Sequence, residues 1–157
     1  MRQSLFILIL SFSFTASAYR TAVSDRGYRE CFSEDQDGHL FGLAVSPNLC
    51  TSGYAIARSD RGYNECYRRD KEGHLFGVAV RERFCAANYS TATSDRGYRE
   101  CFAEDKKGVR FGLAVSPSLC TASYKTAVSD RGYRECFRVD RNGHLFGLAV
   151  REVHCAR

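Results

Sequence analysis

The chain has 157 residues with eight cysteines, no tryptophan and a formal net charge of +5. Basic and acidic residues are interleaved and no stripe of Lys or Arg stands out, so the composition does not predict a nucleic-acid partner. An even number of cysteines without any C-x-x-C pair predicts disulfides rather than a zinc site.

The N-terminal segment predicts secretion. Met1-Arg2 is followed by an apolar run over residues 5–14 and by Ala16-Ser17-Ala18, which together are typical of a secretory signal peptide. The run is shorter than the roughly 20 residues that a membrane-spanning helix needs, so no membrane span is expected. We therefore expect residues 1–18 to be removed from a secreted, extracellular protein (periplasmic if the source is bacterial). Without Arg2, 22 basic and 18 acidic residues leave a net charge of +4.

The remaining chain consists of four tandem repeats, which we number 1 to 4: residues 19–53, 54–88, 89–123 and 124–157. The pentapeptide Ser-Asp-Arg-Gly-Tyr recurs every 35 residues, and we call it the SDRGY box. Repeats 1 and 3 end in Ser-Pro-x-Leu-Cys-Thr (type A), whereas repeats 2 and 4 end in Arg-Glu-x-x-Cys-Ala (type B). A fixed period of this length is typical of a solenoid, a propeller or an array.

Each repeat is predicted to be a three-stranded meander. In repeat 1 the strands are expected at 19–23, 28–32 and 39–45, with turns at 24–27 and 35–38. The third segment is apolar on both faces, which predicts the most buried strand. The alternative is a helix from Asp25 to Asp37 capped by Ser24, but it would place Gly27 in the first turn.

A single repeat is too small to fold alone, so the repeats must pack together, be held by disulfides, or both. The two cysteines of each repeat are 19 positions apart. Pairing within each repeat is the simplest arrangement, and crossed pairing of Cys31 with Cys85 and Cys50 with Cys66 is the main rival. We expect an all-β protein of about twelve strands, either one propeller-like or prism-like body or two 70-residue lobes.

The SDRGY box is the candidate ligand-binding site. Carboxylate and guanidinium groups bond hydroxyls and tyrosine supplies an apolar face, which is the equipment of a sugar site, and four copies would add avidity. The structural alternative is that Asp-Arg-Gly makes a turn and the charges pair locally. The candidate residues are Asp25, Arg26, Tyr28, Arg29, Glu30, Asp60, Arg61, Tyr63, Glu65, Asp95, Arg96, Tyr98, Arg99, Glu100, Asp130, Arg131, Tyr133, Arg134 and Glu135.

Metal binding is not predicted. Asp35-Gln36-Asp37-Gly38 suggests a calcium loop, but its counterparts fill with Lys and Arg, as a hairpin turn tolerates and a calcium loop does not. A histidine stands at 39, 74 and 144 but Val109 replaces it in repeat 3, and His154 stands where repeat 2 has Phe84, which indicates a packing or surface role.

Catalysis is not predicted either, because the chain offers the same groups four times rather than different groups converging on one atom. No cofactor is expected. The sequence predicts a multivalent binding protein, lectin-like or a defence or host-interaction factor, whose partners are extracellular glycans or cell-surface proteins. The alternatives are a structural or matrix protein without a ligand and a disulfide-rich toxin or antimicrobial protein. Asn88-Tyr89-Ser90 is a candidate N-glycosylation site.

Overall fold

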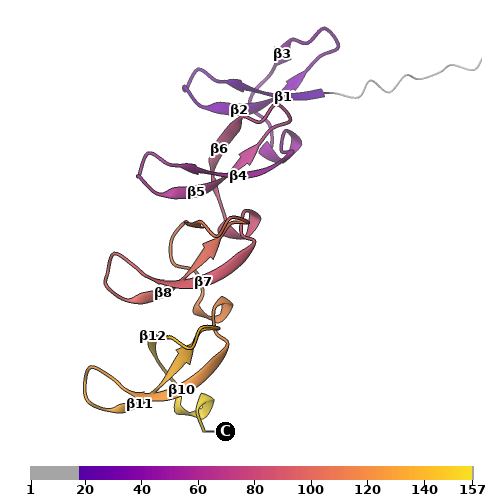
Figure 1. Cartoon of the computed structure of the whole chain (residues 1–157). Helices are drawn as coiled ribbons and strands as arrows, with labels where there is room; N and C mark the ends of the chain where they lie inside the picture. The colour runs from indigo at the N-terminus through magenta and orange to yellow at the C-terminus, as the bar shows by residue number, and fades with distance from the viewer. Residues whose placement is uncertain (1–17, 157) are drawn as a thin grey trace, which may run out of the picture.

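The computed structural model describes residues 18–156. They form four separate three-stranded antiparallel sheets, one in each repeat, arranged in a row (Figure 1). Most of the expected signal peptide, residues 1–17, lies outside the described residues. Within the described part, no helix is long and apolar enough to cross a membrane.

Each repeat has three strands, as predicted, but the third strand of repeats 1 and 3 is only two residues long and is therefore much shorter than the expected 39–45. The strands are β1 (Ala18–Val23), β2 (Arg29–Glu34) and β3 (Leu40–Phe41) in repeat 1; β4 (Gly53–Arg58), β5 (Asn64–Arg69) and β6 (Leu75–Val80) in repeat 2; β7 (Asn88–Thr93), β8 (Arg99–Glu104) and β9 (Arg110–Phe111) in repeat 3; and β10 (Ser123–Val128), β11 (Arg134–Val139) and β12 (Leu145–Val150) in repeat 4.

The two turns of each meander are built by local chemistry. In the first turn of repeat 1, the Gly27 N–H donates to the Ser24 carbonyl at 2.9 Å, and Gly27 has a φ of +79°, which glycine adopts readily. In the second turn, Asp35 Oδ1 accepts hydrogen bonds from the backbone N–H groups of Asp37 and His39 at 3.0 and 2.8 Å. The segment from Asp25 to Asp37, for which a helix was the alternative, therefore contains strand β2 between two turns.

The third strand is not the most buried one, so that prediction was wrong. Leu43 is 89% exposed, and its counterparts Val78, Leu113 and Leu148 are exposed as well. The physical reason is Gly42, whose φ of +76° interrupts the extended backbone and turns the following side chain out of the sheet. In repeats 2, 3 and 4 the phenylalanine before this glycine packs against the preceding repeat, and Val45, Val80 and Val115 also pack against the buried clusters that these rings enter.

The disulfides close each repeat on itself, which confirms the simpler pairing. A short 3-10 turn, not predicted from the sequence, carries the second cysteine back to the middle strand; these turns are Pro47–Leu49, Glu82–Phe84, Pro117–Leu119 and Glu152–His154. The bonds are Cys31–Cys50, Cys66–Cys85, Cys101–Cys120 and Cys136–Cys155.

The repeats stack in an open row and do not close into a ring, so the propeller-like or prism-like body was wrong (Figure 1). We call the contact between two neighbouring repeats a seam. At each seam a phenylalanine packs beside a cysteine of the preceding repeat: Phe76 beside Cys31, Phe111 beside Cys66, and Phe146 beside Cys101. Burying one such ring contributes roughly 1.5–3 kcal/mol. The cores of repeats 1, 2 and 3 are therefore each completed by a phenylalanine of the following repeat.

The A–B alternation appears in the seams. At the first and third seams, Thr21 donates to the Asp70 carboxylate and Thr91 donates to that of Asp140. At the second seam Ile56 stands at the threonine position, and the Gly112 N–H donates instead to the Asn64 carbonyl at 2.6 Å. The two kinds of seam therefore give the stack its two-repeat period.

Candidate functional site

The four SDRGY boxes lie at the tips of the first hairpin of each repeat, and the four tips project from the same side of the stack (Figure 1). Each box ends in an exposed tyrosine: Tyr28, Tyr63, Tyr98 and Tyr133 have exposed fractions of 69%, 46%, 63% and 69%. Because these rings do not contribute to a core, folding alone does not require them.

The charged residues of the boxes are partly paired. Arg26 pairs with Glu30 at 3.0 Å and Arg96 with Glu100 at 2.8 Å, but exposed pairs of this kind contribute little to stability. Within the described residues, the box aspartates have no side-chain hydrogen bond or ion pair: Asp25, Asp60, Asp95 and Asp130. The turn is therefore made by serine and glycine, and the aspartate is left to face solvent.

The remaining candidate residues divide between structural and solvent-facing roles. Nη1 of Arg29 and Nη1 of Arg99 each donate to the threonine of the neighbouring strand at 3.2 Å, which supports the seam. Nη2 of Arg131 lies 3.8 Å from Oε1 of Glu135, as an ion pair. Arg61 and Arg134 are exposed.

Repeat 2 departs from this pattern. Asn64 replaces the arginine of the other repeats, and Glu65 accepts a hydrogen bond from the Tyr67 hydroxyl at 3.3 Å. Burial and the nearby Glu65 carboxylate raise the pKa of Tyr67. The second seam thus differs in both packing and polar chemistry from the seams on either side.

A groove of about 640 Å³ lies at this second seam, within the usual range for a small-ligand site. It brings together the boxes of two repeats, with Tyr63 from repeat 2 and Asp95, Arg96 and Glu100 from repeat 3. The walls also include Arg58, Asn64, Thr93, Ser94, Phe102, Arg110, Phe111, Leu113 and Ala114. The sequence predicted the box residues but not that two boxes would share one groove.

Polar groups of the groove wall remain available. Glu100 pairs with Arg96 through Oε1, while its Oε2 is buried without a hydrogen-bond partner among the described residues. Such an oxygen is an acceptor for a water or a ligand hydroxyl. Asp95 adds a second carboxylate, and Tyr63 and Leu113 add exposed apolar surface.

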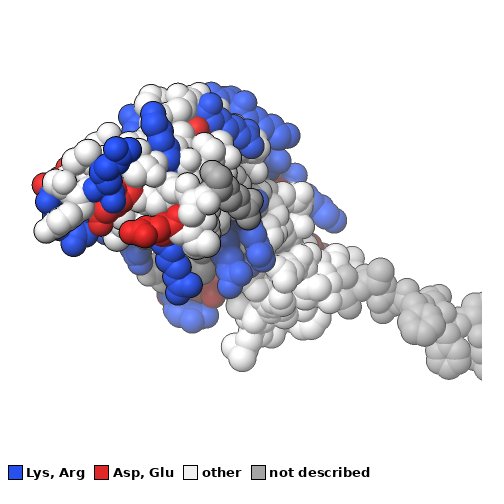
Figure 2. Space-filling model, turned by 90° about the horizontal axis from the view of Figure 1, so that it is seen from below, with Lys and Arg blue, Asp and Glu red and all other residues white. Residues whose placement is uncertain are grey.

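Charge is mixed over the end of the stack that repeat 4 forms. Figure 2 shows Lys and Arg scattered over this end with acidic and uncharged side chains between them. The pattern agrees with the interleaved charges of the sequence. It offers no continuous basic track on the face in view.

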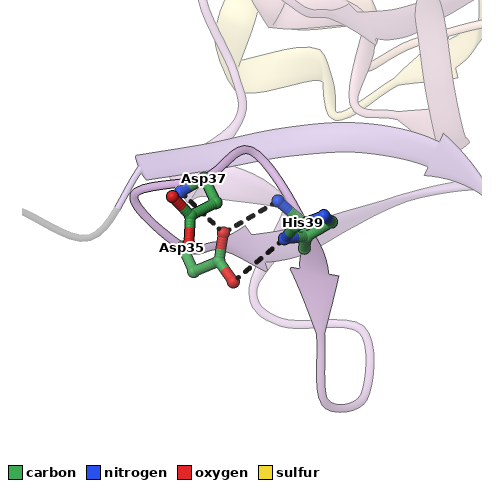
Figure 3. A group of neighbouring side chains, drawn as sticks. All are labelled: Asp35, Asp37 and His39. Carbon is green, nitrogen blue, oxygen red and sulfur yellow. Dashed lines mark hydrogen bonds and ion pairs between the residues drawn. The ribbon is translucent and has the colours of Figure 1, made fainter.

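In the second hairpin turn the aspartate carboxylate accepts hydrogen bonds from backbone N–H groups of the same turn. In repeat 1 the Asp35 carboxylate lies between Asp37 and His39 (Figure 3). Asp35 Oδ1 accepts the two backbone N–H groups described above, and Oδ2 lies 3.6 Å from Nδ1 of His39. In repeat 3, Asp105 makes the same bonds although Lys107 and Val109 stand at the other two positions. The aspartate serves the turn in both cases, as predicted from the sequence.

The structure also defines the surroundings of two further candidate residues, His154 and Asn88. His154 stacks on Tyr124 with ring centroids 4.7 Å apart, as Phe84 stacks on Tyr54 at the same distance, so the packing role of His154 is confirmed. Asn88 is exposed at the start of β7. Its glycosylation stays a prediction.

No family model, curated protein or solved structure matches this chain. Its function must therefore be argued from the groove and the hairpin tips themselves.

Proposed function

We propose that this chain is a secreted multivalent binding protein for extracellular glycans. The observation that carries the proposal is the groove at the second seam, in which an exposed tyrosine faces carboxylate and guanidinium groups from a neighbouring repeat. Pyranose rings have one apolar face and a rim of hydroxyls, so they need both kinds of contact.

The groups of the groove have separate roles in this proposal. Tyr63 and Leu113 contact the apolar face of a sugar ring, while Asp95 and the Arg96–Glu100 pair bond its hydroxyls. Charge-assisted hydrogen bonds of this kind fix orientation as well as affinity. The exposed tyrosines of the other boxes supply weaker contacts along the same side of the stack, which suits a polymer with repeated units (Figure 1).

Secretion belongs to the same proposal. Four disulfides are typical of proteins from oxidising compartments. The signal-peptide pattern of residues 1–18 supports export to the outside of the cell.

The experiment is a glycan array followed by titration of the best oligosaccharide against three proteins: wild type, Tyr63→Ala and Tyr98→Ala. Tyr98 is the matched control because it belongs to the same motif and is exposed but does not line the groove. We expect Tyr63→Ala to weaken binding by on the order of tenfold or more, as for loss of a stacking aromatic contact, and Tyr98→Ala to weaken it much less.

Equal losses in both variants would move the principal site from the groove to the hairpin tips. Absence of binding to every glycan at millimolar concentration would overturn the carbohydrate proposal. Circular dichroism of each variant checks that the fold is unchanged, which we expect because both rings are exposed.

A further inference from the structure

The first repeat of the stack carries an apolar group that the other repeats bury. Phe76, Phe111 and Phe146 are each 3% exposed because each packs on the preceding repeat, whereas Phe41, at the same position in repeat 1, is 53% exposed. Since this phenylalanine is the central contact of every seam, repeat 1 presents one half of a seam to solvent.

The last repeat presents the other half. Beside its disulfide is a hollow of about 250 Å³ whose walls include Thr126, Cys136, Cys155 and Ala156. The counterparts of these four residues in repeat 2 are Ile56, Cys66, Cys85 and Ala86, and they form the cluster in which Phe111 is buried. The hollow is therefore the place where a following repeat would insert its phenylalanine.

From these two ends we infer that copies of this chain associate head to tail, with Phe41 of one copy packed beside the Cys136–Cys155 disulfide of the next. The joint places a type A repeat after a type B repeat, as the second seam already does within one chain. The occupant of the hollow is thus a second copy of this chain.

The joint also offers the polar pair of the first and third seams, which the second seam lacks because Ile56 stands at the threonine position. Thr21 and Thr91 each donate to an aspartate of the following repeat, Asp70 and Asp140 respectively. Thr126 occupies the same position in repeat 4 and is exposed, and Asp35 occupies the aspartate position in repeat 1 and is also exposed. In the joint Thr126 donates to the Asp35 carboxylate of the next copy.

Charge also favours the association of unlike ends. Repeat 1 contains three basic and five acidic residues, whereas repeat 4 contains seven basic and four acidic residues. Opposite charges attract the two ends and disfavour contact between two like ends. Figure 2 looks onto the repeat 4 end of the stack and shows more Lys and Arg than acidic side chains on the face in view.

The geometry of such a joint has two consequences. Because the contact joins two different surfaces and the stack is open, it propagates into linear assemblies instead of closing into a dimer. A seam within the chain is favoured by its covalent link, which a joint between chains lacks, so we expect weak association with a Kd of roughly 0.1–1 mM. The inference does not depend on glycan binding.

The test is sedimentation velocity of the oxidised protein without ligand, from about 10 µM to about 1 mM, a range that brackets this Kd. Wild type is expected to form dimers and larger species as concentration rises, less so at high salt. Phe41→Ser is expected to weaken association by about tenfold or more. Leu148→Ser is the control, because Leu148 is 80% exposed but does not line the hollow beside the Cys136–Cys155 disulfide, and it should associate like wild type.

A second pair of variants tests the other end. Thr126→Asp places a carboxylate opposite Asp35 and should abolish association, whereas Thr126→Lys should preserve it. Each of Phe41→Ser and Thr126→Asp retains one intact end of the joint. Mixing these two variants should therefore give a heterodimer that grows no further, although each alone stays monomeric.

Three results would overturn the inference. They are a wild type that remains monomeric at about 1 mM, the upper limit of the expected Kd, association that Phe41→Ser leaves unchanged, and a mixture of the two variants that forms no heterodimer. Because no glycan is present, these results leave the proposed binding function to its own experiment.

Discussion

Thr21 donates a hydrogen bond to the carboxylate of Asp70, 49 residues further along the chain, and the same pair recurs between Thr91 and Asp140. The two carboxylates are only 3% and 6% exposed. Burial by itself would raise the pKa of each aspartate, but hydrogen bonds from the threonine and from the backbone N–H of His74 or His144 lower it. The pKa of Asp140 is lowered to about 2. Two of the three seams therefore depend on an ionised, hydrogen-bonded carboxylate.

Acid should weaken these seams. The pKa of Asp140 is lower in the folded protein than the usual value near 3.9, so its stabilisation is complete above that value and disappears as the pH falls toward 2. We expect the unfolding free energy to drop by on the order of 2 kcal/mol from Asp140 alone over this interval. Urea unfolding at pH 5 and pH 2 measures it.

The matched variants for the acid experiment are Asp140→Asn and Asp130→Asn. The first removes the titrating group but keeps an oxygen that can accept from Thr91, so its stability should vary less with pH. The second changes an exposed aspartate of the same repeat and should behave like wild type. An unchanged pH dependence in Asp140→Asn would contradict the assignment.

Phe146 and Phe41 occupy the same position of the repeat but should contribute very differently to the free energy of unfolding. Phe146→Ala opens a cavity beside the Cys101–Cys120 disulfide and should cost about 3 kcal/mol or more. Phe41→Ala removes a ring that is half exposed and should cost within about 0.5 kcal/mol. Denaturant unfolding at low protein concentration, where chains do not associate, compares the two. Similar costs would show that the seams are not held by this ring.

Local structure was predictable from the sequence because the signals are local. Asp35 and Gly38 specify a hairpin turn through bonds made within four residues, and the Ser24–Gly27 turn is equally self-contained. The spacing of the cysteines likewise favoured the pairing that the structure has. Strand order and the disulfides therefore followed from residues close together in the chain.

The stacking was not predictable in the same way. Whether four meanders close or stay open depends on the angle between neighbouring repeats, which Phe76, Phe111 and Phe146 set by packing across seams. The single replacement of this threonine by Ile56, against Thr21, Thr91 and Thr126, was visible in the sequence but gained meaning only beside Asp70 and Asp140. The groove was missed for the same reason, since Tyr63 and Asp95 meet only through stacking.

Removing a disulfide should have effects that depend on its place in the stack. The double variant Cys101→Ala/Cys120→Ala should lose about 3 kcal/mol, as expected for a closed loop of this size. Because Phe146 packs on this disulfide, faster hydrogen exchange should extend into repeat 4. In Cys136→Ala/Cys155→Ala the faster exchange should stay within repeat 4. If the faster hydrogen exchange of Cys101→Ala/Cys120→Ala were confined to repeat 3, it would contradict a core shared by repeats 3 and 4.

Gly112 is expected to be the least replaceable glycine of the second seam. Both Gly112 and Gly77 have positive φ, +73° and +71°, so alanine at either position costs about 1 kcal/mol or more from backbone strain. At Gly112 the new Cβ would also lie 2.6 Å from Cγ of Glu82, whereas at Gly77 nothing lies within 4 Å. Gly112→Ala should therefore lower the melting temperature more than Gly77→Ala, as differential scanning calorimetry can measure. The double variant Gly112→Ala/Glu82→Ala should recover to the level of Gly77→Ala, and equal melting temperatures for the two single variants would show that this close approach does not hold the second seam.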